Sequence, residues 1–365
     1  MKSIHTLASA LVSVFVAVYL LELGFSLTWV IYYLMIHHGV LLVFTFLAAY
    51  LSNHIGLIRT LSIHLVFLVS YLILLFQLPH SPEIFFLIPV LGGIESAFYW
   101  MPLNVLFVRK TDEKTMGSSY SKLIALPKIV SVLAPIGGAF IISQYGFNTL
   151  FIIALCIYVL AIIPLIPLRS EKTEFKFSLR RYAEIYRENK KFIIPEIIDN
   201  LAEDAMVLWS ILIFLKLDSV FHVGGIATVV GIAGIVFTLT LGRLTDRWNK
   251  HKLIKIGALG IIIAWSINYL VASYSLDPLL FYIGTILISF ALKTFMIPYG
   301  SFLYNRARKD DAQFLVLREI PTVFGRQILF LLVLVCINQI ELVFLVVALL
   351  FLYFLFFDTR KLISL

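Results

Sequence analysis

The sequence predicts an all-α membrane protein whose twelve transmembrane helices form two pseudo-symmetric six-helix bundles. Composition is the first observation that predicts this fold. Of the 365 residues, 61% are hydrophobic and only 14% are charged, whereas soluble globular domains contain about 45–50% apolar and about 25% charged residues. A soluble chain with this composition would expose large apolar patches. The composition therefore excludes a disordered chain, a disulfide scaffold and an ordinary soluble domain.

Apolar runs of membrane-spanning length are the second observation. A helix needs about 20 residues to cross the hydrocarbon core, so twelve helices would use about 240 residues and leave only short connections. The expected spans are 4–21, 27–51, 58–78, 84–108, 118–143, 147–168, 192–215, 221–244, 252–274, 278–305, 313–337 and 339–358. The first run follows Lys2 as a signal peptide would, but no clear cleavage site follows it, so we expect a first helix there.

The distribution of positive charge is the third observation. Of the 29 Lys and Arg residues, 23 fall in, or within about four residues of, alternate connections that begin with the N-terminus, one (Lys216) falls in the others, and five lie deeper within spans. Cytoplasmic loops of membrane proteins are enriched in Lys and Arg. We therefore expect an integral, multi-pass protein of the cell (inner) membrane with both termini in the cytoplasm. The net charge of +8 then marks the cytoplasmic face. The expected partner is the lipid bilayer, and no nucleic-acid partner is expected.

The longest connection, residues 169–191, divides the chain into an N-terminal bundle, 1–168, and a C-terminal bundle, 192–365. Four apolar residues recur at helical spacing among its basic residues: Leu179, Tyr182, Ile185 and Tyr186. This pattern predicts an amphipathic helix that lies on the inner leaflet. A regulatory or partner-binding arm is the alternative.

The two halves also repeat. When the chain is shifted by about 193–196 residues, segment 49–60 falls on 242–253, Pro102 falls on Pro298 and Lys122 falls on Arg318. Each match is weak alone, but together with the central connection they indicate an internal repeat. In membrane proteins with such repeats, the substrate site lies near the bilayer midplane where the halves meet.

The connection after the eighth expected span carries a recognisable motif. It reads Gly242-Arg243-Leu244-Thr245-Asp246-Arg247-Trp248-Asn249-Lys250-His251-Lys252-Leu253. This segment resembles the G-x-L-[AS]-D-R-x-G-R-[RK]-x-L loop of the major facilitator superfamily, with Thr245 and Asn249 as departures. In the first half, Asn53 stands where the family usually has Asp. The resemblance implies an alternating-access transporter with the fold of that superfamily, and we expect it to act as a monomer.

The same resemblance suggests a cytoplasmic gate made of Gly242, Asp246, Arg247 and Lys250. A glycine lets one helix end approach its neighbour closely, and a carboxylate can pair with cations or with a helix N-terminus. We hypothesise that Asp246 stabilises the state that is closed to the cytoplasm. The basic residues keep the loop on that side of the membrane.

Charged residues inside the spans need a reason, because each costs about 2.5–3.5 kcal/mol at the bilayer centre on insertion scales. The seventh span carries five polar residues on one helical face: Glu196, Asp199, Asn200, Glu203 and Asp204. At a rise of about 1.5 Å per residue, Glu196 lies about 6 Å and Asp204 about 18 Å from the cytoplasmic interface. We expect this stripe to face protein or a water-filled cavity, although Glu196 could simply sit at the interface.

Cations of matching depth lie in other spans. The same rise places Arg318 about 8 Å and Arg326 about 20 Å deep, so Asp204 and Arg326 agree to within about 2 Å. His37 and His38 cannot point the same way, because adjacent helical residues are about 100° apart. The residues expected to line a substrate and proton-coupling cavity are Asp199, Glu203, Asp204, Arg326, Lys293, Glu319, Glu95, Lys128 and His37.

Motifs for other chemistry do not occur in the sequence. It contains no P-loop, no paired-glycine dinucleotide motif, no His/Cys metal motif and no Gly-x-Ser-x-Gly elbow, so we expect no enzyme, no cofactor and no metal. A secondary active transporter of a small solute, with proton coupling left open, is the function that the sequence favours. The alternatives are a non-transporting membrane receptor or scaffold with the same fold and, last, an intramembrane enzyme.

Overall fold

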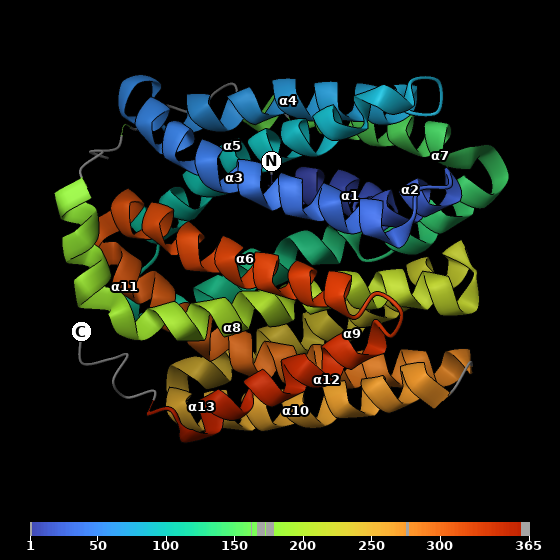
Figure 1. The fold of residues 1–365 in the computed structure, drawn as a ribbon. Coiled ribbons are helices and arrows are strands. Elements are labelled where there is room, and N and C mark those ends of the chain that lie inside the picture. The colour runs from blue at the N-terminus through green and yellow to red at the C-terminus, as the bar shows by residue number, and fades with distance from the viewer. Residues whose placement is uncertain (1, 162, 166–171, 173–178, 275–276, 359–365) are drawn as a thin grey trace.

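The computed structural model describes residues 2–161, 163–165, 172, 179–274 and 277–358. Within these ranges the regular elements are helices, and no β-strand occurs (Figure 1). The helices of the first half are α1 (Lys2–Val12), α2 (Val16–Glu22), α3 (Leu27–Ile55), α4 (Leu57–Gln77), α5 (Leu87–Lys110), α6 (Met116–Ser131) and α7 (Ala134–Leu160). The short 3₁₀ helices are η1 (Pro82–Phe86), η2 (Glu113–Thr115) and η3 (Ile163–Leu165).

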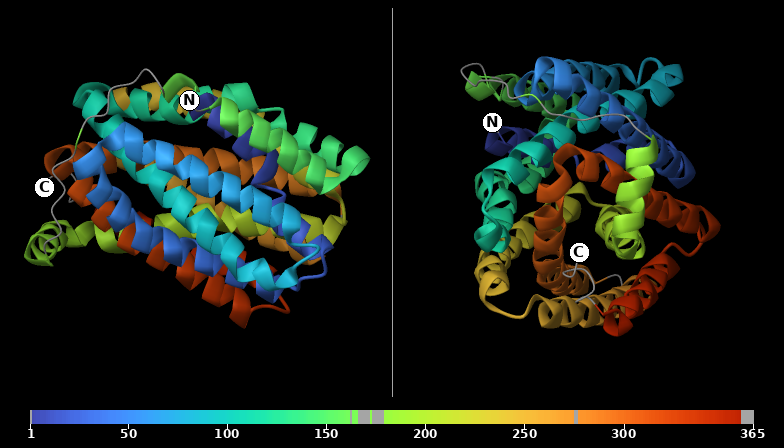
Figure 2. Two further views of the ribbon diagram at one scale, coloured as in Figure 1. Left: turned by 90° about the horizontal axis from the view of Figure 1, so that it is seen from above. Right: turned by 90° about the vertical axis from the view of Figure 1, so that its left-hand side faces the viewer.

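The helices of the second half are α8 (Leu179–Leu217), α9 (Val220–Arg247), α10 (Lys250–Tyr274), α11 (Pro278–Val335), α12 (Glu341–Leu350) and α13 (Leu352–Phe356). In Figure 1 the blue to green helices of the first half lie above the yellow to red helices of the second half. The side view in Figure 2 shows the same two groups, stacked one on the other.

Eight helical stretches of the described chain are long and apolar enough to cross a membrane. Large apolar side chains point outward from them, as lipid-facing residues do; examples are Val43, Val66, Phe140 and Val236. These features confirm an all-α, multi-pass integral membrane protein. The count of twelve spans stays a prediction, because besides these eight stretches there is one shorter apolar stretch, Glu341–Phe356, in the described residues.

The expected span 118–143 is divided in the structure. Helix α6 ends at Ser131 and α7 begins at Ala134, with Pro135 in its first turn. A proline fits the first turn of a helix but clashes with a preceding one, which explains the break. Further along α7, Gly146 has a φ of 79°, a left-handed conformation that only glycine adopts at low cost. The chain therefore turns inside α7, at the connection that the sequence predicts between 143 and 147.

Helix α8 runs without interruption across the expected boundary between 191 and 192. The apolar face of its first turns packs on the protein. Ile185 is 1% exposed, and the ring of Tyr182 lies 6.0 Å from that of Phe46 in α3. The prediction that this face lies on the inner leaflet is therefore wrong. Hydrophobic periodicity shows that a face must be buried, but it does not distinguish a lipid surface from neighbouring helices.

Helix α11 covers two expected spans, 278–305 and 313–337. A straight helix of 58 residues would be about 87 Å long. However, Tyr299 and Arg318 both contact Glu196, although they would lie about 28 Å apart along a straight helix. The element therefore turns back on itself, as Figure 1 shows for the orange segment. We call residues 278–305 its first arm and residues 313–335 its second arm.

The fold places Lys216 and Lys252 at opposite ends of α9, because α8 ends just before it and α10 begins just after it. We expect a cysteine at position 216 and one at position 252 to react with a membrane-impermeant thiol reagent from opposite sides of sealed vesicles. The background would lack Cys156 and Cys336, and Lys114→Cys is a control that should label from the same side as Lys252→Cys. Labelling of positions 216 and 252 from one side would contradict this topology.

Candidate functional site

A cavity of about 430 Å³ lies where the two halves meet. It falls within the range of about 300–1,000 Å³ that is usual for small-molecule sites. Residues of α1, α3, α5, α6, α8 and both arms of α11 line it. Its charged and polar lining comprises Lys2, Thr6, His37, His38, Thr45, Ser96, Asn104, Lys128, Asn200, Glu203, Lys293, Arg318, Glu319, Thr322 and Arg326. The cavity thus joins side chains that are far apart in the sequence.

Six of the nine side chains expected at this cavity line it: His37, Lys128, Glu203, Lys293, Glu319 and Arg326. The other three, Asp199, Asp204 and Glu95, are not part of the lining. Asp204 lies behind the wall, paired with a lining residue. Asp199 is buried, and its Oδ1 has no hydrogen-bond partner in the described part of the chain. Glu95 lies inside the first half.

Glu196 is the main site residue that the expected set omits. It is 1% exposed, and its carboxylate is 2.6 Å from Nε of Arg318. It also accepts hydrogen bonds from Tyr299 Oη at 3.2 Å, from Thr322 Oγ1 at 3.2 Å and from Asn200 Nδ2 at 3.0 Å. Glu196 therefore does not sit at the interface. Its expected depth, within about 2 Å of that of Arg318, was the signal that could have identified this pair.

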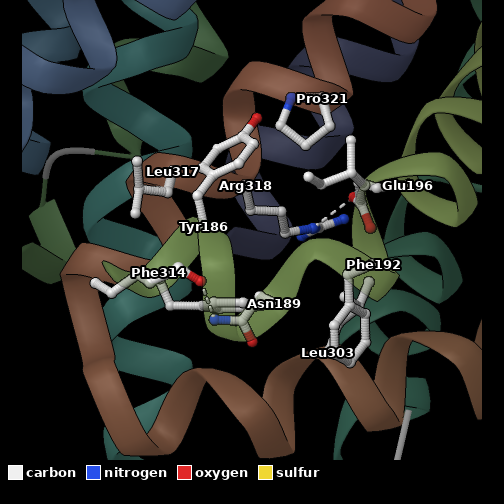
Figure 3. A pocket seen from close by; sticks show the side chains of 11 residues that line it. Tyr186, Asn189, Phe192, Glu196, Leu303, Phe314, Leu317, Arg318 and Pro321 are labelled. Atoms are coloured by element: carbon white, nitrogen blue, oxygen red, sulfur yellow. Dashed lines mark hydrogen bonds and ion pairs between the residues drawn. The ribbon is translucent and has the colours of Figure 1, made fainter. Parts of the chain in front are cut away.

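Figure 3 shows Arg318 reaching from the second arm of α11 toward Glu196 on α8. The walls around the pair are largely apolar and include Tyr186, Phe192 and Phe314. The space enclosed there is about 30 Å³, enough for only a few water molecules. The ion pair therefore supports the structure on this side, while Arg318 also lines the larger cavity.

Arg326 forms a second group of contacts nearer the middle of the bundle. Its guanidinium lies 3.4 Å from Glu203 and 3.6 Å from Asp204. It also lies 3.2 Å from Nδ1 of His38, whose Nε2 is 3.2 Å from Asp204. A neutral imidazole with its proton on Nε2 satisfies both neighbours, because Nδ1 then accepts from Arg326 while Nε2 donates toward Asp204. His38 therefore connects the first half to the charges of the second half.

The two groups form what we call the ion-pair ladder, with Glu196–Arg318 as one rung and Glu203/Asp204–Arg326 as the other. The paired residues are separated by 122 positions in the first rung and by 123 in the Glu203–Arg326 contact. A nearly constant separation means that α8 and the second arm of α11 run parallel. The rungs are about two helical turns, or about 11 Å, apart.

Three ionisable side chains gather in the first half, away from the cavity. Nε2 of His5 lies 3.6 Å from Glu95, His64 is fully buried, and the possible ligand atoms of all three lie within 4.8 Å of one another. Among the described residues this is the one group that could hold a metal ion. The carboxylate of Glu95 faces His5, so the cluster has a polar contact of its own.

Asp246 lies at the seam between the halves. Its Oδ1 and Oδ2 accept hydrogen bonds from the backbone N–H groups of Gly117 and Ser118, each at 2.9 Å. These groups belong to the first turn of α6, where helix N–H groups lack partners and the helix dipole favours a negative charge. A Cβ on Gly242 would lie 3.2 Å from the Gly117 carbonyl oxygen and would collide with Ser121. Glycine at 242 thus permits the close approach of α9 to α6.

The two basic residues of the expected gate lie elsewhere. Nζ of Lys250 is 5.2 Å from the ring centroid of Phe302 in the first arm of α11, within the range of a cation–π contact. Arg247 is exposed at the last residue of α9. Of the four expected gate residues, Gly242 and Asp246 are therefore the two that contact α6.

Helical bundles of this kind, with a charged cavity between two halves, define a membrane transporter. The chain belongs to the Major Facilitator Superfamily, whose family model matches residues 2–316.

Solved transporter structures share its fold. The human organic anion transporter MFSD10 (TETRAN) matches with a TM-score of 0.70 at 12% identity, over 97% of this chain and 96% of that one. The transporter FucP in its outward conformation matches with a TM-score of 0.71 at 12% identity, over 99% and 96% of the two chains. A variant of the E. coli fucose:proton symporter FucP gives 0.70, also at 12% identity and over 99% and 96%. No curated protein matches the sequence.

The seam contact leads to a prediction for Asp246→Asn. The variant keeps one acceptor oxygen but loses the charge that two N–H groups and the helix dipole stabilise, so the closed seam should weaken by about 1–2 kcal/mol. We expect cysteines placed beside the seam to react faster with thiol reagents, while the amount of inserted protein stays the same. Glu184→Gln, which removes a charge from an exposed ion pair within α8, is the control. Unchanged accessibility in Asp246→Asn would show that this contact does not hold the seam closed.

Proposed function

We propose that this membrane transporter moves a small solute by alternating access and couples that movement to protons. The observation that carries the proposal is the group formed by Arg326, Asp204 and His38, which joins the two halves beside the cavity. The sequence has no nucleotide-binding motif, so an ion gradient or the gradient of the solute would supply the energy.

Protonation of His38 would change this group in a defined way. A neutral His38 can accept from Arg326, whereas a doubly protonated His38 can only donate. It would then repel Arg326 and attract Asp204 more strongly, so the contact between the halves would rearrange. The charged and titratable groups around His38 are Asp204, Arg326, Glu203 and His37. A proton on His38 therefore acts on the contact with Arg326 that must break when one half moves against the other.

The remaining features of the proposal follow from the charge distribution and the family. Both termini lie in the cytoplasm, the protein resides in the cell (inner) membrane, and it works as a monomer on a small-molecule substrate. With this orientation the Asp246 contact closes the cytoplasmic side. Transport of a small solute and coupling to protons are both compatible with the fold, because one structural neighbour is an organic anion transporter and another is a fucose:proton symporter.

The test of the function itself is uptake and efflux in proteoliposomes against a panel of solutes, with and without an imposed pH gradient. Transport that responds to the pH gradient supports the full proposal. Transport that ignores the gradient would remove proton coupling only. A receptor or scaffold with this fold would transport none of the solutes and would tolerate neutralisation of the ion-pair ladder.

The group at Arg326 predicts a specific pattern in a double-mutant cycle. Asp204→Asn and Arg326→Gln should each reduce transport at least about tenfold, because each leaves a buried charge without its partner. The double variant should lose less than the sum of the two effects in free energy. The pH dependence of transport should also change in each single variant.

A matched pair of substitutions serves as the control. Lys216 and Glu341 form an ion pair at 3.5 Å between α8 and α12, away from the cavity lining. Lys216→Gln and Glu341→Gln should leave the pH dependence of transport unchanged. If Asp204→Asn and Arg326→Gln transport normally between pH 5 and pH 8, about the range where histidine titrates, the group only packs the helices.

A further inference from the structure

Three lysines line the cavity. Nζ of Lys2 lies 5.8 Å from the ring centroid of Trp100, and the other two differ from the cavity's arginines in having no ion-pair partner in the described part of the chain. Lys128 on α6 and Lys293 on the first arm of α11 both line the cavity. For neither of them does the described part of the chain place a carboxylate oxygen within 4.0 Å, the distance at which Arg318 and Arg326 are paired. The two ammonium groups are also close enough to each other for their charges to interact. The cavity thus holds two neighbouring positive charges that the protein itself does not neutralise by contact.

Glu203 is the lining carboxylate that lies within electrostatic range of both lysines. Its Oε2 is already 3.4 Å from the guanidinium of Arg326, so this carboxylate is shared among three cations. Asp199 also acts on Lys293, but Asp199 is not part of the cavity lining. Positive charge therefore exceeds negative charge on this part of the wall, which favours an anion in the cavity.

The wall beside the lysines is apolar and aromatic. Leu123, Ile124 and Pro127 belong to the same helix as Lys128, and Trp100 and Met296 come from α5 and α11. Such a surface fits the body of an organic molecule, while the ammonium groups fit a charged end. With a volume of about 430 Å³, the cavity has room for both parts.

We propose that Lys128 and Lys293 together bind the anionic group, a carboxylate or a phosphate, of a small organic solute, so that the substrates are organic anions. Lys128 belongs to the first half and Lys293 to the second, so the anion binds both halves at once. A ligand that favours one arrangement of the halves shifts their equilibrium. That the bound anion is carried across the membrane rests on the proposed function, whereas its binding does not.

The experiment uses the purified full-length protein in detergent and three probes: benzoate, phenyl phosphate and benzamide. Benzamide has nearly the shape of benzoate but no charge. We expect saturable binding of at least one of the two anions by titration calorimetry, and no binding of benzamide at the same concentrations. Comparison of the two anions distinguishes a carboxylate site from a phosphate site. Absence of binding for both anions, or equal binding of benzamide, would overturn the proposal.

Substitutions then test the two lysines. Lys128→Gln and Lys293→Gln should each weaken binding of the anion at least about tenfold, as expected for the loss of one charged hydrogen-bond donor. Lys128→Arg and Lys293→Arg should stay within about threefold of the original affinity, because the charge remains. Lys122→Gln, on the exposed side of α6, is the matched control and should not change the affinity.

Thermal unfolding without ligand separates binding from a structural role. Removal of one of two neighbouring like charges relieves repulsion, so Lys128→Gln and Lys293→Gln should unfold at the same temperature as the original protein or at a higher one. A clear decrease, with affinity unchanged, would mean that the lysines support the fold and that the proposal is wrong.

The outcomes also separate this proposal from the proposed function. Anion binding that depends on both lysines, without transport of any solute, would leave the binding site in place and remove the transport proposal. Proton-coupled transport of an uncharged solute that persists in Lys128→Gln and Lys293→Gln would support the transport proposal and remove the anion-site proposal.

Discussion

Charges inside a membrane must meet opposite charges or water, and this requirement determines how α8 lies against α11. Glu196 and Arg318 are matched at one depth, and Asp204 and Arg326 at a depth about two turns further along. Because an unpaired charge at either place would be costly, only a parallel alignment of α8 with the second arm in this register satisfies both rungs. The fold-back of α11 follows, since Tyr299 on its first arm also donates to Glu196. The position of the cavity wall thus depends on the ladder.

Two of the contacts between the halves are central to the proposed function, and they lie at different depths. At the end where α9 meets α10, Asp246 accepts from the first turn of α6, and Gly242 allows the backbones to approach. Within the bundle, His38 bridges α3 to Arg326 and Asp204. In the proposed cycle the first contact opens at one stage, while the second responds to protons. In the first half Asn53 replaces the family's Asp, so the two repeats are chemically unequal at this seam.

The sequence predicts the fold class and the depths of the charges, but not the rotation of each helix. The depth of a residue follows from the fixed rise of a helix, so the equal depths of Asp204 and Arg326 could be predicted from the sequence. Rotation depends on packing, and for this reason Glu95, expected at the cavity, faces His5 instead. The same limit explains the amphipathic face of α8: its periodicity predicts burial, but the surface that covers it is protein. The turn within α11, in contrast, was predicted, because the charged segment between the expected spans 278–305 and 313–337 marks it in the sequence.

Arginine and lysine have different roles in this protein. The rungs use arginine, whose planar fork of donors holds Glu196 in one geometry and bridges Glu203 and Asp204. The cavity wall uses lysine at 128 and 293, a compact charge on a flexible chain that can follow a ligand as the halves move. An arginine pair that is satisfied within the protein gains little from a solute, whereas two unneutralised lysines gain much. The contacts of Arg326 with Glu203 and Asp204 therefore leave the two lysines without a contacting carboxylate and available for the anion.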